Sequence, residues 1–123
     1  MSTLSFNKKT AMTLEQQRSK FAWDCVQGCN KGYVVLAKSA PALIMNNGLM
    51  QTLCYLQDKK HFELLKHLRE WLAKRFPEFT QVTDFEALIG KLLKADSAQY
   101  RQATEEALLL LRWIRQFAAA VGG

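Results

Sequence analysis

Apolar residues recur every three to four positions along most of this chain, which is the spacing of one face of an α-helix. No run alternates apolar and polar residues over the length of a strand, and hairpin dipeptides flanked by β-branched residues are missing. The pattern predicts an all-α fold. The clearest apolar stripe lies between His61 and Phe76 and consists of Leu64, Leu65, Leu68, Trp71 and Leu72.

Capping and breaking residues predict where the helices begin and end. Thr13 and Gln16 fit a capping box at the start of the first helix. A second helix, from Tyr33 to Ser39, should stop before Pro41, because proline disfavours helical geometry in the residue that precedes it.

The remaining boundaries lie in the second half of the chain. Pro77 should end the helix that carries the leucine stripe. Thr83 and Glu86 fit another capping box, which opens a short helix. Ser97 is placed to cap the last and longest helix, at about residues 98–121.

The stretch from Ser39 to Leu56 contains two apolar halves that meet at Asn46-Asn47-Gly48. It is not a membrane span, because Pro41 and the polar residues interrupt it before the roughly 20 apolar residues that a span needs. Asn and Gly tolerate left-handed backbone geometry, and Asn47 could cap a following helix. We therefore expect two short buried helices joined by a tight turn.

At 123 residues the chain has the length of one domain and is long enough to bury a core without disulfides or a metal. We expect a flexible N-terminal arm over residues 1–12. Residues 13–123 are predicted to form a compact single-domain bundle of about six helices.

The net charge is +6, with a pI near 9.4, and it is unevenly distributed. Residues 1–60 contain eight Lys and Arg against three Asp and Glu, so they carry +5, whereas residues 61–123 carry nine against eight. A basic surface favours nucleic acid, an acidic membrane surface or an acidic partner. The asymmetry indicates that such a partner would meet mainly the first half of the chain.

Arg18 projects between Leu14 and Phe21, within the apolar stripe of its own helix. A guanidinium cannot lose its charge, so it needs a partner there. Either it pairs with a carboxylate of this chain, such as Glu63 or Glu70, or extends to the rim, or it contacts a phosphate or a partner subunit.

Two groups of residues are candidates for binding. The last helix carries a mixed basic and apolar face suited to a neighbouring subunit, formed by Arg101, Leu108, Arg112 and Arg115. The candidate RNA-binding residues, which could also be an ordinary solvated face, are Arg18, Lys20, Lys38, Lys59, Lys60, Lys66 and Arg69.

The sequence contains no nucleophile elbow, phosphate-binding glycine loop or zinc signature, and we expect neither an enzyme, a cofactor nor a small-molecule substrate. Cys25 and Cys29 are predicted to be buried free thiols rather than metal ligands, since the two histidines share no compact motif with them. The odd number of cysteines and the absence of an apolar leader before Met12 favour a reducing, cytoplasmic compartment.

Several motifs, in order along nearly the whole chain after residue 12, resemble one protein family. They are Leu14-Glu-Gln-Gln-Arg18, Ala22, Ala37-Lys-Ser-Ala-Pro41, Ile44-Met-Asn-Asn-Gly48-Leu49, Leu53-Cys-Tyr-Leu56, His67-Leu-Arg-Glu-Trp71-Leu72, Glu105-Glu-Ala-Leu108 and Leu111-Arg-Trp113. The chain resembles the small subunit of the type III-B CRISPR effector, the Cmr complex.

The resemblance implies a non-catalytic α-helical subunit that acts in antiviral defence. Its copies would stack in a filament beside the backbone subunits and would line the groove where target RNA pairs with guide RNA. The implied partners are the backbone subunit, the large subunit, further copies of itself and the guide RNA–target RNA duplex, with no membrane. Arg18 and Lys20 belong to the N-terminal motif. The alternative is a helical adaptor that contacts only proteins and has no direct nucleic-acid contact.

Overall fold

The computed structural model describes residues 11–122, and within that range it contains six α-helices and one 3₁₀ turn, which confirms the all-α prediction. The predicted N-terminal arm lies outside the described residues except for residues 11 and 12. The elements are α1 (Leu14–Val26), α2 (Lys31–Asn47), α3 (Leu49–Asp58), α4 (Phe62–Arg75), η1 (Pro77–Phe79), α5 (Phe85–Lys94) and α6 (Ser97–Gly122).

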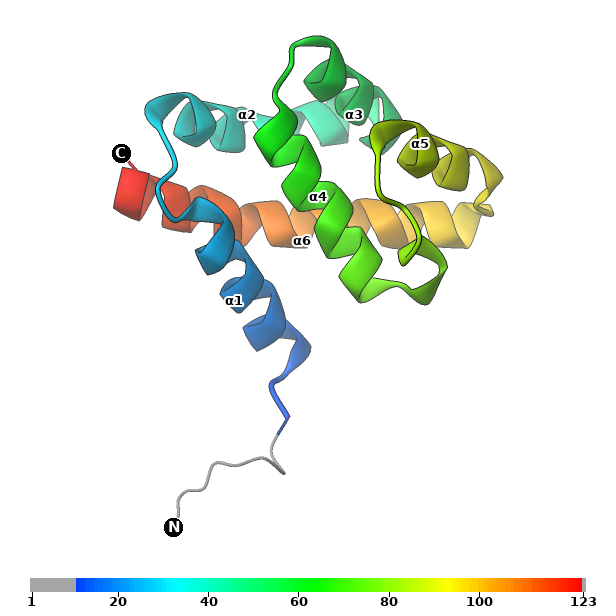
Figure 1. Cartoon of the computed structure of the whole chain (residues 1–123), viewed down its shortest axis with the longest axis horizontal. Helices are drawn as coiled ribbons and strands as arrows, with labels where there is room; N and C mark the ends of the chain where they lie inside the picture. Colours follow the sequence, from blue (N-terminus) through cyan, green and yellow to red (C-terminus); the bar gives the residue numbers. More distant parts are fainter. Residues whose placement is uncertain (1–10, 123) are drawn as a thin grey trace.

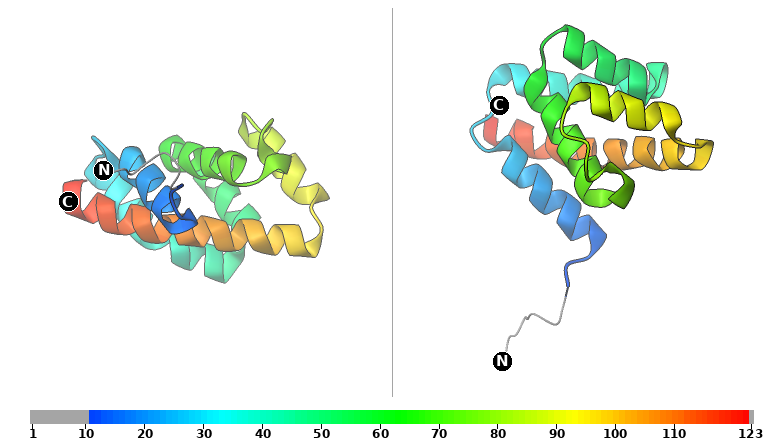
Figure 2. Two further views of the ribbon diagram at one scale, coloured as in Figure 1. Left: turned by 90° about the horizontal axis from the view of Figure 1, so that it is seen from below. Right: turned by 45° about the vertical axis from the view of Figure 1, so that its right-hand side comes forward.

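The long helix α6 runs the length of the molecule, and α1, α2 and α4 pack against it (Figure 1). Figure 2 shows from two further directions that the ends of α6 lie at opposite ends of the bundle. The last turn of α6 reaches the α1–α2 connection, where a Cβ built on Gly122 would lie 2.6 Å from Cys29 Sγ. A single helix thus provides the surface on which much of the bundle is assembled.

The first and fourth helices follow the sequence prediction closely. The Thr13 hydroxyl accepts a hydrogen bond from the Gln16 backbone N–H at 3.1 Å, and the Gln16 side chain accepts one from the Thr13 N–H at 2.9 Å. Helix α4 ends at Arg75, two residues before Pro77. The five residues of its predicted apolar stripe are all buried.

The prediction that Pro41 stops the second helix is wrong, because α2 continues through Pro41 to Asn47. A proline inside a helix removes one backbone hydrogen bond and costs about 3 kcal/mol. Ala37, Ala40 and Ile44 are almost completely buried on both sides of that position. The burial of this apolar face offsets the local cost, since packing decides most helical stability in proteins.

The turn predicted at residues 46–48 is confirmed, but its cap is different. Gly48 separates α2 from α3 with φ 88° and ψ 163°, and Asn47 belongs to α2 rather than capping α3. The side chain of Tyr100 replaces the missing cap, because its hydroxyl accepts a hydrogen bond from the Met50 N–H at 3.0 Å. The start of α3 is thereby fixed to α6.

The caps predicted for the last two helices are each displaced by one residue. Asp84, and not Thr83, caps α5, since its carboxylate accepts a hydrogen bond from the Ala87 N–H at 2.8 Å. Asp96, and not Ser97, precedes α6, where it exchanges hydrogen bonds with Gln99. In both cases the aspartate next to the predicted hydroxyl residue accepts the capping hydrogen bond.

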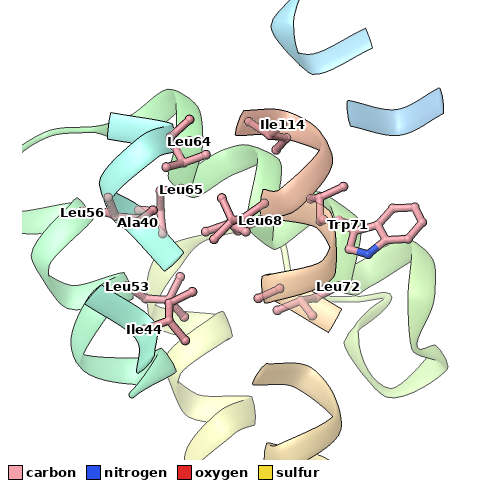
Figure 3. Close-up of a cluster of buried hydrophobic side chains, with 14 of the residues drawn as sticks. Ala40, Ile44, Leu53, Leu56, Leu64, Leu65, Leu68, Trp71, Leu72 and Ile114 are labelled. Atoms are coloured by element: carbon pink, nitrogen blue, oxygen red, sulfur yellow. The ribbon is translucent and has the colours of Figure 1, made fainter. Parts of the chain in front are cut away.

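The core lies where α2, α3, α4 and α6 meet (Figure 3). Leu64, Leu65 and Leu68 of α4 lie among side chains of the other three helices, and the indole of Trp71 extends away from this aliphatic cluster. The core face of α6 extends from Ala103 to Ala118. None of the helices within residues 11–122 is long and apolar enough to cross a membrane.

Replacing Gly48 with alanine should destabilise the protein by about 1–3 kcal/mol, because its backbone conformation is open essentially to glycine alone. Gly90 is the matched control, since it lies inside α5 and a Cβ at that position would meet no atom within 4 Å. Gly90→Ala should stabilise the protein by about 0.5–1 kcal/mol. Urea unfolding of both variants measures the difference, and equal effects would contradict the assigned geometry.

Candidate functional site

The side chain of Glu106 is buried at the point where α1, α4 and α6 meet. Arg18 donates two hydrogen bonds to it, from Nε to Oε1 at 2.6 Å and from Nη2 to Oε2 at 3.0 Å. Trp71 Nε1 donates to Oε1 at 3.1 Å, and Arg75 Nε donates to Oε2 at 3.1 Å. Both carboxylate oxygens are therefore fully engaged by groups from two other helices.

This arrangement compensates the cost of burying a charge. Burial alone would raise the pKa of Glu106, but the hydrogen bonds from Arg18 and Trp71 and the charges of Arg18 and Arg75 outweigh it, so that the pKa is lowered. The hydrogen bond to Glu106 also raises the pKa of Arg18. The pair with Arg18 is bidentate, the strongest geometry for this pairing.

Of the alternatives considered for Arg18, the structure contains the pair with a carboxylate of the same chain. The partners are Glu106 and, at 3.1 Å, Glu15, rather than Glu63 or Glu70. Sequence reasoning missed Glu106 although a signal was present, since it lies three residues after Ala103 and four before Leu110, which is the spacing of one helix face. An acidic residue at such a position needs a buried cationic partner.

The other candidate RNA-binding residues come from three helices and the α3–α4 turn. Two are engaged locally: Lys20 contacts Asp24 at 3.2 Å, and Lys66 contacts Glu70 at 3.9 Å. Four take part in no ion pair among the described residues: Lys38, Lys59, Lys60 and Arg69. The three lysines are exposed, and Arg69 is half-buried.

The candidate interface on the last helix lies on the outer side of α6. Arg101, Arg112 and Arg115 are exposed, and Leu108 between them is half-buried and packs against the core. None of the three arginines pairs with a carboxylate within the described part of the chain. This face is therefore available to a neighbouring molecule.

A groove of about 950 Å³ separates α1 from α4. Phe21 and Trp71 pack against each other in its lining with ring centroids 5.1 Å apart, and Met12 and Leu14 extend the apolar lining. Lys20 lines the same groove. Sequence reasoning did not anticipate this groove, because it depends on how the two helices diverge over α6.

Residues 14–121, which span all six helices, match the model of a family described as CRISPR-associated protein (Cas_Cmr5). The chain belongs to this family. Its members are small subunits of the type III-B Cmr complex, so the family resemblance of the motifs is confirmed. The chain is accordingly a subunit of a Cmr complex.

One further polar contact joins two helices of this Cmr subunit. The Tyr33 hydroxyl and His67 Nδ1 form a hydrogen bond of 2.7 Å between α2 and α4. All three cysteines are free, but Cys25 and Cys29 are only partly buried, and burial raises the pKa of the Cys25 thiol to about 12. Over residues 11–122, no group of three or more His, Cys, Asp or Glu side chains could hold a metal ion.

Replacing Glu106 with glutamine should cost about 3–5 kcal/mol of unfolding free energy, since two guanidiniums would lose the charge that compensates them. The neighbouring Glu105 is exposed and makes no ion pair in the described chain, so Glu105→Gln is the matched control and should change stability by at most about 0.5 kcal/mol. Denaturant unfolding of the isolated protein measures both. A loss below about 1 kcal/mol for Glu106→Gln would contradict the assigned role.

The same cluster predicts a specific loss of stability in acid. Because the folded-state pKa of Glu106 is lowered, its stabilisation is complete above the unfolded pKa of about 4.3 and disappears as the pH falls through the folded value. The pKa of His67 is also lowered, by desolvation, so His67 adds a loss that begins below about pH 6.5.

The loss of stability that comes from Glu106 should vanish in Glu106→Gln. The loss that begins below about pH 6.5 should remain, because His67 is present in both proteins. The measurement is the unfolding free energy between about pH 7 and pH 3. The stability difference between the two proteins should stay constant down to about pH 4.5 and then shrink. A difference that is independent of pH would overturn the assignment.

Proposed function

We propose that this Cmr subunit is non-catalytic and lines the groove in which target RNA pairs with guide RNA, in the cytoplasm and in antiviral defence. Copies of the chain stack into a filament beside the backbone subunits and contact the large subunit. Its task is to supply positive charge along the RNA path and helical faces for its neighbours. Contacts of this kind read backbone and duplex shape and leave sequence to base pairing.

The observation that carries the proposal is the family match over residues 14–121, which covers the whole described bundle. The arrangement of cations supports it. Lys59 and Lys60 lie in the α3–α4 turn, exposed and without an ion pair among the described residues. Lys60 also lines a hollow of about 270 Å³ together with Asn30 and Gly32 at the start of α2. A helix start and lysines together attract phosphate groups.

Arg18 is a weaker candidate than these lysines. Its side chain is 11% exposed, and its guanidinium is bound by Glu106 and Glu15. A phosphate would have to compete with a buried carboxylate for it. We therefore place the RNA contacts on Lys38, Lys59 and Lys60 first. Lys20 and Lys66 follow, because an exposed ion pair is worth at most about 1 kcal/mol and yields easily to phosphate.

The face of α6 that carries Arg101, Leu108, Arg112 and Arg115 favours the second candidate function, an adaptor that contacts only proteins. Exposed arginines around a half-buried leucine are typical of protein interfaces. An adaptor would assemble into the complex through this face without changing its affinity for RNA. The two candidates therefore differ in a measurable property of the assembled complex.

The experiment compares two double variants. One combines Lys59→Glu with Lys60→Glu, and the other combines Lys91→Glu with Lys94→Glu on α5, which changes the net charge by the same amount. Each variant is assembled with the other Cmr subunits and guide RNA, and target-RNA affinity is measured over a range of salt concentrations. The α3–α4 variant should bind at least about tenfold more weakly. Its salt dependence should fall by about one unit of logarithmic slope for each lost lysine contact.

Unchanged affinity and salt dependence in an intact complex would favour the adaptor. A complex that assembles and binds RNA normally without this chain would exclude the RNA-lining role. The α5 variant guards against a general effect of net charge, because it alters the charge by the same amount elsewhere.

A further inference from the structure

The groove between α1 and α4 has the size and lining of a site that receives another molecule. Its volume of about 950 Å³ lies at the upper end of the range for ligand pockets. Phe21, packed on the buried Trp71, gives the groove an apolar base, and Met12, which is 45% exposed, adds to one end. These apolar groups line the groove, whereas most large apolar side chains of the chain are buried in its core.

The charges along the groove are unequally compensated. Lys20 is paired with Asp24, and Arg75 is committed to Glu106. Lys74 is exposed and takes part in no ion pair among residues 11–122. Glu70 of the lining is paired with Lys66 at 3.9 Å, so the uncompensated charge of the lining is positive.

This charge lies at one end of the groove. Helices α1 and α4 run in opposite directions, so the first turn of α1 and the last turn of α4 lie at the same end (Figure 1). That end combines Met12 and Leu14 with Lys74 and Arg75. A complementary occupant places an apolar side chain over Phe21 and a carboxylate near Lys74.

The chemistry of the groove favours a protein segment over RNA. Asp24 and Glu70 stand on its two walls, so a run of phosphates along the groove would meet carboxylates, whereas a single carboxylate at the Lys74 end would lie beside cations. Trp71 is 2% exposed and its N–H is bound to Glu106, so it offers no free ring face for a base. Residues 1–10 contain lysines but no Asp or Glu, so this chain's own N-terminal segment does not provide the carboxylate.

We propose that the groove between α1 and α4 binds an acidic, apolar segment of a different protein of the Cmr complex. The binding mode is an apolar side chain in a groove with a charged anchor at its end. This inference rests on the proposed function only in taking the partner from the same complex. It assigns to the groove a role separate from that of Lys38, Lys59 and Lys60, which lie outside it.

The first test replaces Met12 with the photo-crosslinking residue benzoylphenylalanine, with the same replacement of Met45 as the control. Met45 is exposed on α2 and lines none of the grooves described. The full chain is assembled with the other purified Cmr subunits and RNA, irradiated, and digested for mass spectrometry. Position 12 should crosslink to a segment of another subunit that contains Asp or Glu beside large apolar residues, and position 45 should not reach that segment.

The second test compares Lys74→Glu with Lys94→Glu, two exposed lysines in the last turn of their helices. Incorporation into the complex is titrated for each variant. Lys74→Glu should require about tenfold more protein for half-maximal incorporation, while Lys94→Glu should stay within about twofold. Equal thermal unfolding of the isolated variants controls for folding.

The proposal is overturned if position 12 crosslinks to RNA, to a second copy, to its own chain or to nothing, or if Lys74→Glu behaves like Lys94→Glu. If Lys74→Glu has no effect while the Lys59 and Lys60 variant still weakens RNA binding, the groove proposal fails alone. If the chain is absent from the assembled complex, the proposed function fails, and the groove proposal fails with it.

Discussion

The carboxylate of Glu106 accepts hydrogen bonds from Arg18 of α1 and from Trp71 and Arg75 of α4, so that three helices meet at one buried charge. The three donors differ in chemistry. Arg18 provides a bidentate guanidinium, Trp71 an indole N–H that needs an acceptor, and Arg75 a second cation near the surface. Because an unpaired charge in this place is costly, alternative placements of α1 on the bundle are disfavoured. The position of α1, and with it the shape of the groove beside α4, depends on this cluster.

The cluster also divides the positive charges of the bundle into those that contribute to folding and those that remain available to RNA. Arg18 and Arg75 are drawn inward by Glu106, whereas Lys59 and Lys60 remain exposed in the α3–α4 turn. Positive charge that is bound inside contributes to folding, and only the charge that stays outside is available to RNA. A Cmr subunit of 123 residues can in this way be basic overall and still have one groove suited to a protein segment.

The helices were predictable because their apolar stripes are strong and their caps are local. The leucine stripe of α4 and the capping box at Thr13 both depend on residues at most a few positions apart. Pro41 misled the prediction, since local preference opposed a helix that burial of its apolar face supports. The pairing of Arg18 with Glu106 spans 88 positions, and no local pattern encodes such a distance. The family could be recognised from its motifs, whereas the groove required the arrangement of α1 and α4.

The central claim is that the contact between Arg18 and Glu106 itself fixes α1 on the bundle. A double-mutant cycle tests it most directly, with Arg18→Met, Glu106→Leu and the double variant compared with the unaltered protein by denaturant unfolding. The account predicts a coupling energy of about 2 kcal/mol or more, because either single change leaves a buried charge without its bidentate partner. Effects that add within about 0.5 kcal/mol would contradict it.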